Sequence, residues 1–171
     1  MKRKWNRLIP LIITVGQVVV FPYYVIWLKG VSLTFTLFAW LFATHSFSAA
    51  WGYRTFQTKK NKEKSRISFV YLGMGCAYLV VGQFNIEMDF LPYIALILQV
   101  LLGFLQGYFR AWHVEQDSYH LHAVNHYILV GWIMISLSFI KIISPVVIIS
   151  MFGWLLCGCG LLRMLDKNVS N

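Results

Sequence analysis

The chain has 171 residues, of which 58% are hydrophobic, 17% aromatic and only 12% charged, and its formal net charge at pH 7 is +9. Soluble domains usually carry about 25% charged residues, so this composition excludes an ordinary water-soluble globular protein and favours one that lies in lipid. The positive charge does not indicate nucleic-acid binding, because the basic residues stand at the ends of apolar stretches and no basic domain presents them.

Apolar stretches that could cross a bilayer recur about six times along the chain. A helix needs roughly 20 mostly apolar residues to cross the hydrocarbon core. Six such stretches leave no room for a separate soluble domain, so the sequence predicts one all-α integral membrane domain over residues 1–171, a bundle of about six transmembrane helices. Proline at the start of the last stretch is suited to the first turn of a helix. The predicted spans are 8–28, 31–51, 67–84, 90–109, 126–143 and 145–162.

Lys and Arg residues are distributed unevenly between the two ends of these spans. All but two of the 15, Lys29 and Lys141, fall on one side when the spans alternate in direction. Basic residues are concentrated on the cytoplasmic side of membrane proteins. We therefore expect a multi-pass protein of the cell membrane with both termini in the cytoplasm, and with cytoplasmic loops at 52–66 and 110–125 that contact anionic lipid.

The fourth span ends in a stripe of small and polar residues. Gly103 and Gly107 form a small-xxx-small pair, which lets two helix backbones approach closely. Gln99, Gln106 and Arg110 share the face of the two glycines, because these positions follow helical spacing. Polar side chains that face lipid are costly, so the stripe should face protein or a wet cavity. Hydrogen bonding between helices and a polar ligand groove are both consistent with it.

A single histidine, His45, lies within the second span. An ionisable residue inside the membrane is a candidate functional residue that could take up a proton or bind a ligand, although a neutral histidine bonded to a neighbouring helix has the same appearance in sequence. No second histidine lies inside a span to complete a haem site.

Motifs for enzymatic chemistry are not present in the sequence. The three cysteines, Cys76, Cys157 and Cys159, fall within predicted spans and lack the Cys-x-x-Cys spacing of a redox pair. Paired intramembrane carboxylates, a Ser/His/Asp set and metalloprotease spacing are also missing. We therefore expect a protein that is not an enzyme and that has no catalytic residues, no cofactor and no metal site.

Four of the five histidines are concentrated in "RAWHVEQDSYHLHAVNH", residues 110–126. Apolar and polar residues alternate on both sides of Gln116–Asp117, which predicts a short amphipathic hairpin between the fourth and fifth helices. Its polar face is suitable in type for zinc or copper, but a pH-sensing or merely solvated face, which could also contact a partner, is favoured over metal binding. The candidate partner-binding residues are Arg110, His113, Glu115, His120 and His122.

The stretch "GFLQGYFRAWHVEQDSYHLHAVNHYILVGW" resembles the CcdC-like small multi-pass membrane proteins of bacteria. The matching positions are Gly103, Gly107, Arg110 and Trp132, which follow that group's pattern of a Gly-x3-Gly-x2-Arg helix end, a hairpin-like cytoplasmic segment and a return to the membrane near a tryptophan. The earlier "GYRTFQTKK" resembles its basic loop. The resemblance implies a small bacterial membrane protein; a role in cytochrome c biogenesis is not implied, because no haem-binding motif is present.

Two functions follow from these features. The first is a non-enzymatic accessory or regulatory protein whose cytoplasmic loops bind a cytosolic or membrane protein. The alternative is a small transporter or substrate-binding component with a polar intramembrane groove around His45, Gln99 and Gln106. An intramembrane enzyme ranks last.

Overall fold

The structure, a computed structural model, describes residues 2–30, 35–58, 67–83, 90–115, 128–133, 136 and 144–168. Over these residues the fold is all-helical, with no strand. A short helical segment covers 128–133. The longer helices are α1 (Lys2–Gly30), α2 (Phe35–Gln57), α3 (Ile67–Val81), α4 (Leu91–Glu115) and α6 (Pro145–Asn168).

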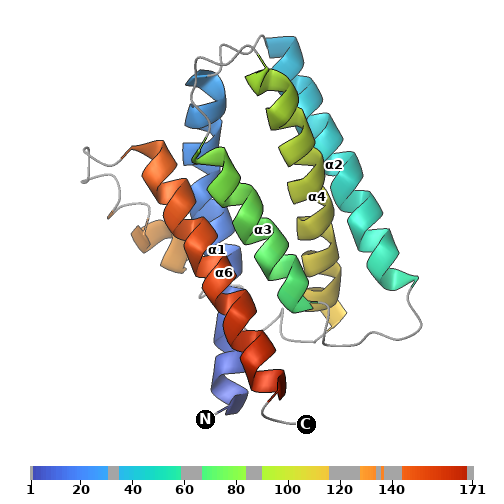
Figure 1. The fold of residues 1–171 in the computed structure, drawn as a ribbon, viewed down its shortest axis with the longest axis vertical. Coiled ribbons are helices and arrows are strands. Elements are labelled where there is room, and N and C mark those ends of the chain that lie inside the picture. The colour runs from blue at the N-terminus through green and yellow to red at the C-terminus, as the bar shows by residue number, and fades with distance from the viewer. Residues whose placement is uncertain are drawn as a thin grey trace.

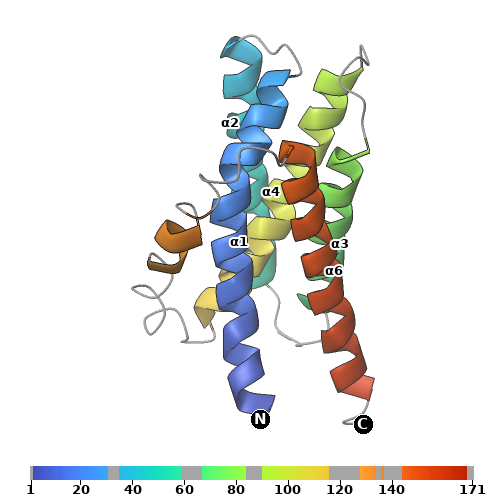
Figure 2. The ribbon, with the colours of Figure 1, turned by 90° about the vertical axis from the view of Figure 1, so that its left-hand side faces the viewer.

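The helices form an elongated bundle in which the start of α1 and the end of α6 lie at the same end (Figures 1 and 2). Helices α2 and α4 also end there, whereas α3 begins there and runs the other way (Figure 1). Three arginines, Arg54, Arg110 and Arg163, stand near the C-terminal ends of α2, α4 and α6, and we call this end of the bundle the basic end.

Helices α2 and α4 pack as a parallel pair with their backbones in contact. A Cβ atom on Gly103 would meet the backbone carbonyl of His45, and one on Gly107 would meet that of Ala49. Gly52 of α2 faces the backbone of Phe104 in the same way. The two glycines of the predicted small-xxx-small pair therefore lie where α2 and α4 are closest, and only a residue without a side chain fits there.

Helices α3 and α6 form a second close pair, which is antiparallel. A Cβ atom on Gly75 would lie 2.8 Å from the carbonyl oxygen of Gly153, and one on Gly160 would lie 3.1 Å from that of Ser68. Helix α1 packs against α6, and α3 joins the second pair to α4. Helix α1 makes only minor contacts with α2 and α4, so a space is left between α1 and the first pair.

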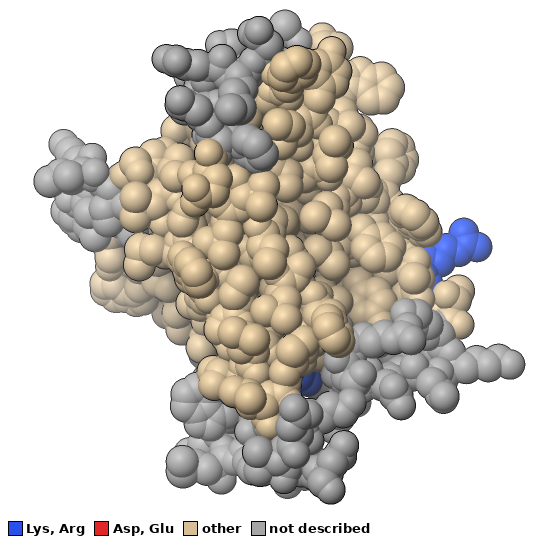
Figure 3. Space-filling view, in the orientation of Figure 1, with Lys and Arg blue, Asp and Glu red and all other residues tan. Residues whose placement is uncertain are grey.

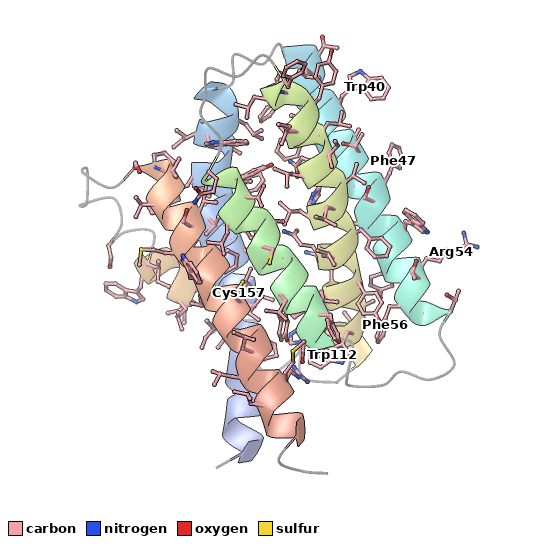
Figure 4. The ribbon with its side chains drawn as sticks, viewed as in Figure 1. Trp40, Phe47, Arg54, Phe56, Trp112 and Cys157 are labelled. Carbon is pink, nitrogen blue, oxygen red and sulfur yellow. The ribbon has the colours of Figure 1, made fainter. Side chains whose placement is uncertain are left out.

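Three of the described helices are long and apolar enough to cross a membrane, over Ile9–Leu28, Leu91–Val114 and Pro145–Leu165. Helix α3 is apolar but shorter, with 15 residues. Large apolar side chains also cover the outside of the bundle: Trp40 and Phe47 are 62% and 75% exposed and point away from it (Figure 4). The face in Figure 3 shows isolated blue patches and no acidic residue among its described atoms. Such a surface suits lipid rather than water.

Two of the predicted boundaries are confirmed and one predicted element is wrong. Helix α3 begins at Ile67 and α6 at Pro145, as predicted. The amphipathic hairpin is wrong for its first strand, because residues 110–115 continue α4 as a helix. Phe109, Trp112 and His113 form a buried ring stack at helical i, i+3 and i+4 spacing, which outweighs the alternation read from the sequence. The predicted second strand lies outside the described residues.

Helix α2 continues to Gln57, beyond the end of the second predicted span and into the predicted loop at 52–66. Phe56 is buried against Tyr108 of α4, with ring centroids 5.0 Å apart, and this contact supports the additional turns. Of the predicted fifth span, 126–143, the structure describes only 128–133 and 136.

Candidate functional site

A cavity of about 1070 Å³ lies between α1, α2 and α4. The glycine contacts hold α2 tightly on α4 while α1 packs on α6, so that the described side chains leave this space between α1 and the first pair unfilled. The described polar residues in its lining come from all three helices: Thr14 and Gln17 from α1; His45, Ser46, Tyr53, Arg54 and Gln57 from α2; Gln106, Arg110 and His113 from α4.

The inner part of the cavity is built around His45 and Gln106. The amide nitrogen of Gln106 donates a hydrogen bond to the hydroxyl of Tyr78 on α3, with 3.1 Å between the two atoms. The side chains of Gln99 and Gln106 are close enough to interact with the ring of His45. Even so, the buried Nδ1 of His45 has no hydrogen-bond partner among the described residues. Buried polar atoms in proteins are generally paired, either with protein groups or with ordered water.

A smaller cavity of about 80 Å³ continues from this inner part toward the end of the bundle opposite the basic end. Gln99, which is only 4% exposed, lines it together with His45, Gln106 and the ring of Tyr24. The three intramembrane polar residues expected from the sequence, His45, Gln99 and Gln106, therefore lie together at one polar region between helices. The hydrogen bond to Tyr78 shows that Gln106 also bonds to a neighbouring helix, as the first interpretation of the stripe expects.

The outer part of the cavity lies toward the basic end. Arg110, on the same face of α4 as Gln106, is exposed and lines the cavity. The side chain of Arg54 extends away from the bundle, so that only part of this residue borders the cavity (Figure 4). The lining described here contains these two arginines and no carboxylate. The electrostatic potential inside should therefore be positive.

One predicted partner-facing residue is not at the surface. His113 is only 6% exposed, and its ring stacks on that of Phe109 with centroids 5.8 Å apart and planes 9° from parallel. The prediction that it lies on a wet face is wrong because residue 113 belongs to a helix packed against its neighbours. Glu115 ends α4, and its side chain lies outside the described residues, as do His120 and His122.

The sequence interpretation missed a cation–aromatic cluster at the basic end. The guanidinium of Arg163 lies 4.6 Å from the ring centroid of Trp112 and 5.9 Å from that of Tyr71, and it donates a long hydrogen bond of 3.4 Å to the Tyr71 hydroxyl. The cluster ties α6 to α3 and α4. Tyr71 is 92 positions from Arg163 in the chain, so nothing local in the sequence indicates the contact.

Gln17 of α1 was also missed, although its sequence signal was present. It is a lone amide in an apolar run, and it lines both cavities with its nitrogen 3.6 Å from the sulfur of Met74. Within the part of the chain that is described, no three His, Cys, Asp or Glu side chains come together as metal ligands.

Comparison with known proteins does not assign a family: no family model matches the chain, and no curated protein and no solved structure matches it either. The likeness to CcdC-like proteins therefore stays a prediction from the short motif at Gly103, Gly107, Arg110 and Trp132 and from the basic segment "GYRTFQTKK".

Proposed function

We propose that the chain is a multi-pass protein of the cell membrane, with six spans and both termini in the cytoplasm, that binds a ligand in the cavity between α1, α2 and α4. It would act as a small transporter or as a substrate-binding component, without enzymatic chemistry. The observation that carries the proposal is the cavity itself, which collects polar side chains from three helices in a chain whose outer surface is apolar.

The energetics of polar groups in lipid support a functional role for the cavity. A polar side chain at membrane depth is costly unless it has a partner or faces water. Gln17, His45 and Gln106 are far apart in the sequence, yet they line one cavity, and the buried Nδ1 of His45 lacks a partner among the described residues. The volume of about 1070 Å³ is slightly above the roughly 300–1,000 Å³ typical of ligand pockets.

The proposed topology is supported by the common position of the helix ends. The start of α1 and the ends of α2, α4 and α6 lie together at the basic end. Most of the 15 Lys and Arg residues belong to segments at or beyond these helix ends, which is the distribution expected on the cytoplasmic side. The cavity would then open toward the cytoplasm near Arg110.

An accessory protein that binds a partner through its cytoplasmic loops is the second candidate. The exposed positions of Arg54 and Arg110 at the basic end favour it. The burial of His113 counts against it, because this residue belongs to the expected contact surface. Crosslinking of tagged protein in native membranes tests this candidate: a partner that is lost with Arg110→Glu supports it, and recovery of the same proteins with both forms contradicts it.

Blocking the cavity tests the ligand-binding proposal. Ala50 lines the cavity and is exposed, so the phenylalanine side chain of Ala50→Phe should fill part of the cavity without steric clashes in the helix contacts. Ala39→Phe is the matched control, because Ala39 is exposed on the same helix outside the lining. Small molecules that co-purify with each protein would be extracted and identified by mass spectrometry.

We expect at least one compound to be enriched with the unmodified protein and with Ala39→Phe, and to be reduced with Ala50→Phe. Equal recovery from all three proteins, or recovery of none, would overturn the proposal.

A further inference from the structure

We propose that the ligand is an amphiphilic anion, with a phosphate or carboxylate head group held near Arg110 and an apolar chain that leaves the cavity between α1 and α2. This inference rests on the proposed function and adds the chemical class of the ligand to it. Three features of the cavity lead to it: the sign of its charge, the unpartnered Nδ1 of His45 and the apolar character of its side opening.

The charge of the lining selects an anion. Arg110 lines the cavity, Arg54 borders it only in part, and the described lining offers no carboxylate to neutralise either charge. The planar guanidinium group of arginine binds phosphate and carboxylate oxygens through two parallel hydrogen bonds. A cationic ligand would find no opposite charge in this lining.

The hydrogen-bonding groups favour a polar head that reaches inward from Arg110. Gln106 lies one helical turn from Arg110 on α4, so the two side chains are on the same face. His45 faces this region from α2, and its buried Nδ1 lacks a partner among the described residues. A head group bound to Arg110 could extend along α4 toward Gln106 and His45, and its oxygen atoms or hydroxyls would supply the missing partner.

The side opening toward α1 is apolar. Leu11 and Val18 of α1 face Ala49 and Ala50 of α2 across the cavity, and both Val18 and Ala50 are exposed. The two hydroxyls of this region are already used within their own helices: Thr14 donates to the Pro10 carbonyl at 3.0 Å and Ser46 to the Phe42 carbonyl at 2.9 Å.

The position of this opening and the volume of the cavity point to a ligand with an apolar chain rather than to a simple ion. The minor contact between α1 and α2 leaves the cavity open at the depth of helices that suit a bilayer, where an apolar chain has lipid as its surroundings. The volume of about 1070 Å³ also exceeds what an inorganic anion requires.

The experiment compares three probes that separate head group from chain. The purified full-length protein would be placed in nanodiscs of phosphatidylcholine, and its thermal unfolding would be followed by tryptophan fluorescence. The probes are oleoyl lysophosphatidate, which carries a phosphate monoester; oleoyl lysophosphatidylcholine, which has the same chain and a zwitterionic head; and inorganic phosphate, which has no chain. A ligand that binds only the folded state raises Tm in proportion to its saturation.

We expect lysophosphatidate to raise Tm more than the zwitterionic probe, and inorganic phosphate to leave Tm unchanged. Arg110→Gln should weaken lysophosphatidate binding about tenfold or more, because it removes a charge-assisted hydrogen bond. Lys60→Gln is the matched control, since it removes the same charge from the basic segment between α2 and α3 and should change nothing. Ala50→Phe should weaken binding of the chain-bearing probe, and Ala39→Phe should not.

Three outcomes would overturn the inference. Equal effects of the two oleoyl probes on Tm would show that the charge of the head group does not contribute to binding. Binding of inorganic phosphate as tight as that of lysophosphatidate would show that the apolar chain does not contribute. Equal effects of Arg110→Gln and Lys60→Gln would show general charge attraction only. In all three cases a compound whose co-purification is reduced by Ala50→Phe would still support the proposed function. A failure of the inferred ligand class can therefore be distinguished from a failure of the proposed function.

Discussion

The α2–α4 and α3–α6 pairs are both held by glycines against backbone, but their surroundings differ. In the parallel α2–α4 pair, Gly103 and Gly107 bring polar residues of two helices to one side, where α1 leaves a cavity. In the antiparallel α3–α6 pair, Gly75 and Gly153 bring together a mainly apolar surface. Glycine contacts therefore produce a closed apolar contact between α3 and α6, and one wall of a polar cavity at α2 and α4. The difference depends on which residues flank the glycines and where the next helix lies.

The largest effect is expected from a side chain placed in a glycine contact. Gly107→Val should destabilise the protein by about 3 kcal/mol, because the new side chain meets the backbone at Ala49, which cannot move aside without separating the helices. Gly158→Val should change stability by less than about 0.5 kcal/mol, because nothing lies within 4 Å of a Cβ at that position. Thermal unfolding in nanodiscs measures both, and equal effects would contradict the close α2–α4 contact.

A smaller effect is expected where α6 is tied to α4. Arg163→Gln removes the cation from the rings of Trp112 and Tyr71, and we expect a loss of about 1–2 kcal/mol for this half-buried site. Arg163→Lys keeps the positive charge and should recover part of that stability. Neither change touches the cavity lining, so affinity for lysophosphatidate should be unchanged. A loss of affinity with unchanged stability would show that the cluster belongs to the ligand site instead.

The smallest effect is expected at the hydrogen bond that joins the two pairs. Tyr78→Phe removes the partner of Gln106 and should cost about 1 kcal/mol. Tyr24→Phe is the matched control, because the buried Tyr24 hydroxyl has no hydrogen-bond partner among the described residues. Its removal should be neutral or slightly stabilising, since a buried unpaired hydroxyl is unfavourable. If the two substitutions cost the same in thermal unfolding, the Tyr78–Gln106 bond does not contribute.

The local sequence pattern was sufficient to predict several features of the fold and the site. Apolar length located α3 and α6, and proline at the first turn also marked the start of α6, because these signals are contained within one segment. The small-xxx-small spacing indicated a close helix contact at Gly103 and Gly107, since only the missing side chains matter there. The alternation of apolar and polar residues at 112–115 led to a wrong prediction, because four residues can alternate on a strand and still present a buried face on a helix.

The sequence by itself therefore determined that the chain is helical over its apolar stretches, suited to lipid, and provided with a few polar residues inside those stretches. Only the tertiary structure decided which helices pair, and hence that Gln17, His45, Gln106 and Arg110 line one cavity while His113 is buried. The physical reason is that the apolar composition of a segment decides whether that segment forms a membrane-suited helix, whereas a cavity depends on the distance between helices. That distance is set by contacts such as Gly107 with Ala49, between residues far apart in the chain.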